Sequence, residues 1–166
     1  TFHRYYDALR GLVNVTDMID SRAGGLWLGT VAGLLEFDPE RGVIRTLGRA
    51  QGLPNDMVAS VLPDRDGHLW LSTAKGIVDF DPGSGALRTF DVRDGLPSND
   101  ACFAHFNDRD GTLYFGGSSG LFHFHPDEMK KVSAFEPPAV LTGLQVFDRA
   151  QKPVPGLGLG PDLPLV

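Results

Sequence analysis

The chain has 166 residues, of which 42% are hydrophobic, and its formal net charge of −6 excludes a surface that binds nucleic acid or anionic lipid through clustered cations. Its 21 glycines and 12 prolines disfavour long helices, and no segment approaches the roughly 20 apolar residues of a membrane-spanning helix. The single cysteine allows neither an internal disulfide nor a cysteine-based metal site. We therefore expect a folded, turn-rich protein without a cofactor.

Short strand-like runs follow one another along the chain. Within residues 57–100, the segment MVASVLPD alternates small or polar with apolar residues, and HLWLST, GIVDFD and ALRTFDV are similarly short. The runs are separated by DRDG, TAKG and DPGSG, whose Asp, Pro and Gly residues favour tight turns. This pattern predicts four antiparallel strands in the segment.

The same arrangement recurs every 43 to 44 residues. Two sets of markers keep this spacing, the aromatic residues Trp27, Trp70 and Tyr114 and the glycines Gly24, Gly67 and Gly111. A four-stranded unit with this period is typical of a β-propeller blade. We therefore predict an all-β fold, a partial β-propeller of about three four-stranded antiparallel blades. The aromatic side chains are expected to pack between blades, with carbohydrate stacking as the alternative.

The expected organisation follows from the repeat. Residues 1–135 hold the propeller: the end of a preceding blade and a linker (1–12), then blades at 13–56, 57–100 and 101–135. Residues 136–166 hold a Pro-rich linker and the first strand of a following module. Since propellers typically close with four to eight blades, three blades leave sheet faces unpaired. We expect either a fragment of a larger propeller, since the chain starts without methionine, or two chains that associate to close a ring of six.

The repeat resembles the two-component regulator propeller repeat, found in periplasmic sensor regions of bacterial receptors of the hybrid histidine kinase and diguanylate cyclase types. The resemblance rests on GLPND and GLPSND in the linkers, on DRDG before Leu-Trp or Leu-Tyr, and on the later Gly and Phe, from Val13 to about Phe135. The tail from Phe124 resembles the exit of such a sensor into a Tyr-rich immunoglobulin-like domain.

This resemblance implies a function. It implies a non-catalytic, ligand-sensing fragment in the periplasm, with the membrane reached only through parts of a parent receptor outside this sequence. In the best-known members of the group the ligands are oligosaccharides, so we expect a small polar ligand of that kind and self-association as a dimer. A propeller enzyme of the lyase or hydrolase type and a protein-binding scaffold are the alternatives.

The linkers between blades and the turns between second and third strands open on one face of a propeller. Polar, mixed-charge side chains that converge there suit a polar ligand. The alternative is that the Asn and Asp residues only cap turns. The predicted ligand-binding residues are Arg49, Asn55, Asp56, Lys75, Arg93, Asp94, Asn99, Asp100, Ser118 and Ser119.

Two further patterns resemble parts of metal sites. The DRDG turns place Asp64 beside Asp66 and Asp108 beside Asp110, but the further ligands of a calcium loop are missing. His123 and His125 share one face of a strand, yet the pair does not recur in the other repeats. We interpret the first pattern as turns and the second as surface histidines, and predict no metal site.

Catalytic residues are not predicted. Cys102 has apolar neighbours and is interpreted as a small core residue. A propeller enzyme would need several acidic or histidine side chains on inner strands, pointing at the axis. Asp17 and His105 are the only candidates, and two are too few.

Overall fold

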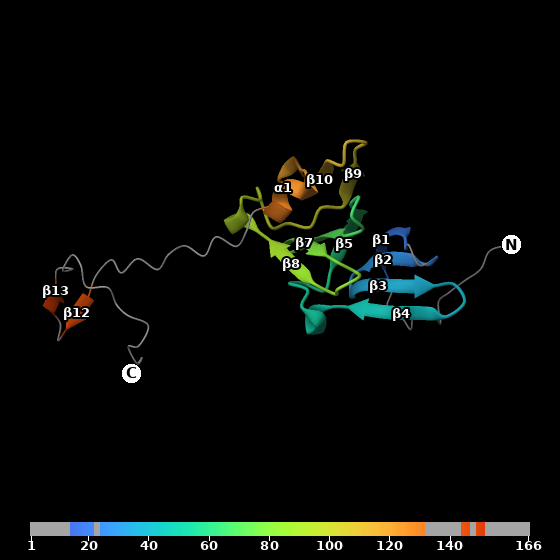
Figure 1. Cartoon of the computed structure of the whole chain (residues 1–166), viewed down its shortest axis with the longest axis horizontal. Helices are drawn as coiled ribbons and strands as arrows, with labels where there is room; N and C mark the ends of the chain where they lie inside the picture. Colours follow the sequence, from blue (N-terminus) through green and yellow to red (C-terminus); the bar gives the residue numbers. More distant parts are fainter. Residues whose placement is uncertain (1–13, 22–23, 132–143, 147–148, 152–166) are drawn as a thin grey trace. The chain divides into compact units, whose positions relative to one another are not determined.

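The computed structural model describes residues 14–21, 24–131, 144–146 and 149–151 (Figure 1). The chain divides into two units, Thr1–Lys131 and Val132–Val166. The described part of the second unit is a short antiparallel pair, β12 (Leu144–Val146) and β13 (Arg149–Gln151). β12 falls in the segment predicted as the first strand of a following module, most of which lies outside the described residues.

The described residues of the first unit form three antiparallel sheets, each with its strands in chain order (Figure 1). The first sheet contains β1 (Val15–Asp20), β2 (Leu26–Thr30), β3 (Gly33–Asp38) and β4 (Gly42–Leu47). The second contains β5 (Val58–Pro63), β6 (Leu69–Thr73), β7 (Gly76–Phe80) and β8 (Leu87–Phe90). The third contains β9 (Ala104–Asn107), β10 (Leu113–Gly117) and β11 (Gly120–Phe124). The predicted all-β, blade-like fold is confirmed.

The third sheet differs from the prediction of four strands. A short helix, α1 (Pro126–Lys131), follows β11 where the other two sheets form their fourth strand. In those sheets Gly42 and Gly85, with φ of 82° and 77°, reverse the chain after the Asp-Pro pair. The third repeat reads HPDEMKK and has no such glycine. Its proline at the first helical position, its acidic first turn and its basic last turn favour a helix instead.

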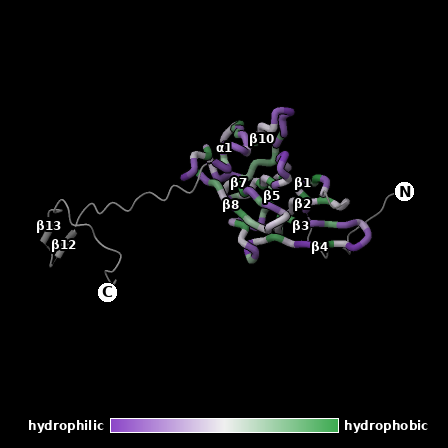
Figure 2. Tube along the Cα trace, in the orientation of Figure 1, coloured by the Kyte–Doolittle hydropathy of each residue, from purple (hydrophilic) through white to green (hydrophobic). Residues whose placement is uncertain are grey.

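The turns form as their residues predict. In DRDG at residues 64–67, Asp64 Oδ1 accepts hydrogen bonds from three backbone N–H groups. They belong to Asp66, Gly67 and His68, and each distance is 2.9 Å. The turn between β2 and β3 requires glycine at Gly33, where φ is 129° and a Cβ would lie 2.2 Å from the Leu47 carbonyl oxygen. Figure 2 shows a hydrophilic turn between β3 and β4.

The core lies between neighbouring sheets. Trp27 is buried and packs edge-on against Phe80 of the second sheet, with ring centroids 5.8 Å apart. Trp70 is buried in the same way against Phe124 of the third sheet, at 4.9 Å. The inner strands β1, β5 and β9 lie next to one another, β5 in the middle. The repeat spacing of the aromatic residues thus reproduces one contact at both sheet-on-sheet interfaces.

The linkers hold two short helices that the sequence analysis missed. They are the 3₁₀ helices η1 (Arg49–Gln51) and η2 (Val92–Asp94), and each ends at a left-handed glycine, Gly52 and Gly95. The first backbone N–H of each helix donates to a side chain seven residues later. The Arg49 N–H donates to Asp56 Oδ1 at 2.7 Å, and the Val92 N–H donates to Asn99 Oδ1 at 2.9 Å. The linkers are therefore folded elements with internal caps.

Candidate functional site

The predicted ligand-binding residues lie on the linkers and on the turns between second and third strands, at one end of the strands. Most of their side-chain oxygens are used to hold the linkers together. Asn55 Oδ1 accepts from the Met57 N–H at 2.8 Å, and Asp94 Oδ2 accepts from the Asp91 N–H at 2.9 Å. Arg93 Nη2 contacts Asp91 Oδ2 at 2.6 Å, an interaction that lowers the pKa of Asp91 and raises that of Arg93.

Three of the predicted residues contact one another. Asp100 Oδ2 accepts hydrogen bonds from Ser118 Oγ at 2.6 Å and from Ser119 Oγ at 3.4 Å, which joins the second linker to the β10–β11 turn. The bond from Ser118 is the main cause that lowers the pKa of Asp100. The carboxylate is therefore ionised and already satisfied by the chain.

Arg49 and Lys75 are two cations at this end of the strands. Among the described residues, the Arg49 guanidinium and the Lys75 ammonium make no hydrogen bond or ion pair, although the backbone N–H of Lys75 binds Thr73 Oγ1 at 3.1 Å. A binding role for the ten predicted residues stays a prediction.

A groove that the sequence analysis missed lies at the other end of the strands, between the first and second sheets. It encloses about 250 Å³. Trp27, Leu69, Pro63 and Pro82 supply apolar walls. Its polar lining comes from Asp20, Ser21, Glu36 and Arg45.

The charged groups of this groove are fixed by contacts. Arg45 Nε lies 3.3 Å from Glu36 Oε2, and Arg45 Nη1 donates to the Pro82 carbonyl oxygen at 2.9 Å. The guanidinium also lies over the Trp27 ring, 5.6 Å from its centroid. Ser21 Oγ donates to Glu36 Oε1 at 3.4 Å. The groove thus presents a positioned guanidinium and a mostly buried carboxylate beside an apolar wall.

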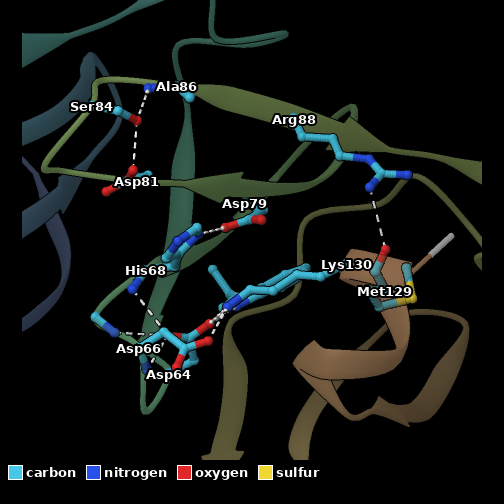
Figure 3. Close-up of polar contacts among 12 residues, drawn as sticks. Asp64, Asp66, His68, Asp79, Asp81, Ser84, Ala86, Arg88, Met129 and Lys130 are labelled. Atoms are coloured by element: carbon cyan, nitrogen blue, oxygen red, sulfur yellow. Dashed lines mark hydrogen bonds and ion pairs between the residues drawn. The ribbon is translucent and has the colours of Figure 1, made fainter. Parts of the chain in front are cut away.

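The corresponding region between the second and third sheets is filled by the chain itself (Figure 3). Asp64, Trp70 and Arg88 stand 43 residues after Ser21, Trp27 and Arg45. Lys130 of α1 reaches into this region, where its Nζ lies 2.8 Å from Asp64 Oδ2 and 2.7 Å from Asp66 Oδ2. A cavity of about 100 Å³ remains beside the turn. Lys130 therefore neutralises the two carboxylates of this turn.

Burial and hydrogen bonding shift the pKa values of Asp64 and Lys130 in opposite directions. Burial acts to raise the pKa of Asp64, but hydrogen bonds from the Lys130 ammonium, the Trp70 indole and the His68 backbone outweigh it, and the pKa is lowered. Burial acts to lower the pKa of Lys130, and the bonds to Asp64 and Asp66 outweigh it, so that pKa is raised. Both groups are therefore charged at neutral pH.

The two inner-strand candidates for catalysis are brought together. Asp17 of β1 and His105 of β9 meet across β5, with Oδ2 and Nε2 3.3 Å apart. The same carboxylate oxygen accepts from the Val61 N–H at 2.7 Å, and His105 Nδ1 lies 3.1 Å from the Phe103 carbonyl oxygen. The pair links all three sheets near the inner strands. Sequence reasoning named both residues but could not see this contact, because neither position repeats.

The other residues singled out from the sequence, His123, His125 and Cys102, contact other parts of the chain. His123 packs against the Tyr114 ring at 5.2 Å, and His125 Nδ1 lies 3.6 Å from Asp127 Oδ2. Cys102 is buried, its backbone N–H binds Ser72 Oγ at 2.7 Å, and burial raises the pKa of its thiol. No group of three or more His, Cys, Asp or Glu side chains suited to a metal ion occurs in the described part of the chain.

The comparison with protein families gives one match. The model described as Two component regulator propeller matches residues 52–75, which run from the first linker to the turn after β6. The resemblance stated from the sequence is confirmed over these residues. No curated protein sequence matches the chain significantly.

Solved structures share the fold. The extracellular domain of BT4673 from B. thetaiotaomicron aligns with a TM-score of 0.60 and 20% identity. BT4673 is described in one structure as a one component system and in another as a hybrid two component system. PorZ of Porphyromonas gingivalis, described as a surface component of the type-IX secretion system, aligns with a TM-score of 0.55 and 22% identity. Each alignment covers 68% or 69% of this chain and 17% of the other. At such identities the likeness shows the fold alone.

Helices that could cross a bilayer are not found among the described residues.

Proposed function

We propose that this chain, whose residues 52–75 carry a two-component regulator propeller repeat, is an extracytoplasmic, non-catalytic sensing fragment that binds a small polar ligand for a signal-transduction receptor. The match to the repeat supports the receptor class. The likeness to a domain described as extracellular, from a one component or hybrid two component system, supports the placement outside the cytoplasm. Because the chain spans 17% of that domain, the receptor's output and its membrane anchor belong to the proposal.

The observation that carries the proposal is the groove between the first and second sheets. Its volume of about 250 Å³ suits a single sugar ring or a molecule of similar size. Its apolar wall and its Glu36–Arg45 pair offer both a surface for a ring face and donors and acceptors for hydroxyl groups. The linker end, where Arg49 and Lys75 pair with no other described residue, is the second place proposed for such a ligand.

The test is a binding measurement that separates the two ends. Mono- and oligosaccharides, neutral and uronic, are titrated into the chain at up to about 10 mM while backbone and indole NMR shifts are recorded. Arg45→Met removes the guanidinium of the groove, and Lys75→Met removes a cation of the linker end. We expect saturable shifts at Trp27 that Arg45→Met abolishes and Lys75→Met leaves unchanged.

Other outcomes discriminate the alternatives. Shifts lost only in Lys75→Met would move the ligand to the linker end and keep the sensing function. Absence of saturable binding across the panel would contradict the proposal for sugars. A stoichiometric metal ion by elemental analysis, with turnover of an added substrate, would favour the lyase or hydrolase alternative.

A further inference from the structure

The groove between the first and second sheets has more acidic than basic groups. Among its described lining residues, the charged side chains are Asp20, Glu36 and Arg45, so two carboxylates accompany one guanidinium. That guanidinium is already engaged by Glu36 Oε2, by the Pro82 carbonyl oxygen and by the Trp27 ring. The excess negative charge therefore favours a cationic ligand over an anionic one.

Glu36 is the carboxylate with room for a further donor. Its side chain is 10% exposed, and its two contacts are long, 3.3 Å to Arg45 Nε and 3.4 Å to Ser21 Oγ. Charge-assisted hydrogen bonds to a carboxylate are usually about 2.7–2.9 Å long, and its two oxygens together accept about four. By comparison, Asp64 accepts from three backbone N–H groups at 2.9 Å and from the Trp70 indole at 3.1 Å. A mostly buried carboxylate as weakly bonded as Glu36 gains most from a close, charged donor.

The neighbouring inter-sheet region shows which donor fits beside a buried carboxylate in this fold. There the Lys130 ammonium lies 2.8 Å from Asp64 Oδ2, which also accepts from the Trp70 indole. Trp27 takes the place of Trp70 in the open groove, where no described lining residue supplies an ammonium. A metal ion is not favoured as the cation, because no group of three or more suitable ligands occurs among the described residues.

We propose that the groove takes a small ligand with a primary ammonium group, an amino sugar rather than an acidic one, with the ammonium against Glu36. Asp20, which is exposed and makes no hydrogen bond or ion pair with the described residues, adds to the attraction. Because pairs with exposed charges contribute little, the larger share comes from Glu36. Arg45 keeps its role as a donor to hydroxyl oxygens. The inference rests on the proposed function, since it names the ligand class of the same groove.

The test compares sugars that share one ring and differ in charge: glucosamine, N-acetylglucosamine, glucose and glucuronate. Each is titrated into the chain at about pH 6, where amines are protonated and carboxylates are ionised, and the Trp27 indole NMR shift is recorded. Glu36→Gln and Asp20→Asn remove the two carboxylates with little change of shape. Glu40→Gln is the matched control, because Glu40 is exposed and does not line the groove. Urea unfolding verifies that each variant is folded, and Asp20→Asn carries the test if Glu36→Gln is not.

We expect glucosamine to bind at least about 10-fold more tightly than glucose or N-acetylglucosamine, and glucuronate to bind most weakly. Glu36→Gln should reduce this preference to less than about 3-fold, Asp20→Asn should reduce it by about 2-fold, and Glu40→Gln should leave it unchanged. Glucose or glucuronate that binds as tightly as glucosamine would overturn the inference and leave the proposed function standing. So would a preference that both carboxylate variants retain in full. Absence of saturable binding by all of these sugars would overturn both.

Discussion

The contact between α1 and the turn before β6 gives the sharpest test of the packing. Asp64 is 3% exposed at its side chain and Lys130 is 25% exposed, so their 2.8 Å ion pair lies mostly out of water. The Asp66 partner is 63% exposed, and such a pair contributes little. The perturbation is Lys130→Met, which keeps an apolar stem of similar length and removes the charge. Lys131→Met on the same helix is the control, because Lys131 is exposed.

The magnitude follows from what remains around Asp64. Loss of one partner from a buried pair costs about 3–5 kcal/mol when the other charge is left uncompensated. Here the carboxylate keeps three backbone N–H donors and the Trp70 indole, at 3.1 Å. A single hydrogen bond to a charged group contributes about 1.5–3 kcal/mol. We expect Lys130→Met to lower the free energy of unfolding by about 2 kcal/mol, a fall of about 6–8 °C in Tm for a unit of this size.

The pH dependence of the effect has a defined sign. The Asp64 pKa is below its ordinary value of 3.8 in the folded chain, so its contribution is present above that value and is lost as pH falls through the folded pKa. The Lys130 pKa is above its ordinary value of 10.5, so its contribution is present below that value and is lost as pH rises through the folded pKa. The difference between wild type and Lys130→Met should therefore be constant from about pH 5 to 9 and shrink outside this window.

Urea unfolding followed by tryptophan fluorescence measures these differences, since Trp70 lies at the contact. Lys131→Met should change the free energy of unfolding by less than about 0.5 kcal/mol. If Lys130→Met is equally silent, or if its effect is independent of pH from 2 to 11, the ion pair does not hold α1 to the second sheet.

Three further predictions concern packing and burial in the sheets. Trp27→Ala should lower the free energy of unfolding, measured in urea, by about 3–5 kcal/mol. Tyr114→Ala, at a half-buried position of the third sheet, should lower it by less than about 2 kcal/mol. Equal losses would contradict the inter-sheet role of the tryptophan. Gly33→Ala should destabilise the chain far more than Gly120→Ala, although both positions have positive φ. The reason is that only the first would place Cβ 2.2 Å from a backbone oxygen. Similar melting temperatures of the two variants would argue against this geometry. The Cys102 thiol should resist iodoacetamide at pH 8 until urea unfolds the chain, since burial both covers it and raises its pKa, and rapid alkylation of the folded chain would show that the site is open.

The fold could be predicted from the sequence because its signals repeat. The 43- and 44-residue spacing of Trp27, Trp70 and Tyr114 marks the second strand of each sheet, and alternation within short runs marks the strands between turns. The helix that stands in place of a fourth strand in the described part of the third sheet was not predicted, because the repeat outweighed the local sequence after Phe124. There the absence of a turn glycine was the available signal, and it was overlooked.

The site could be predicted only in part. The sequence predicts that the linker residues lie together at one end of the strands, and they do, but the roles of some of them as caps of η1 and η2 depend on 3₁₀ helices that leave no periodic signal in three residues. The groove between the first two sheets was missed because its walls come from residues far apart in the chain, such as Ser21 and Pro82. No spacing rule brings such residues together before the sheets pack.

The differences between the two inter-sheet regions indicate how a repeat acquires a site. The first residue of the turn between first and second strands is Ser21 in one repeat and Asp64 in the next. Asp64 pairs with the half-buried Lys130 ammonium because the third repeat forms a helix that carries this lysine, and the region fills. Ser21 leaves Glu36 to pair with Arg45, and a cavity of about 250 Å³ stays open above the same tryptophan position. A groove therefore stays open where one repeat departs from the pattern of its neighbour. A change of Ser21 to Asp would be expected to bring a further carboxylate into the groove, beside an Arg45 that already pairs with Glu36.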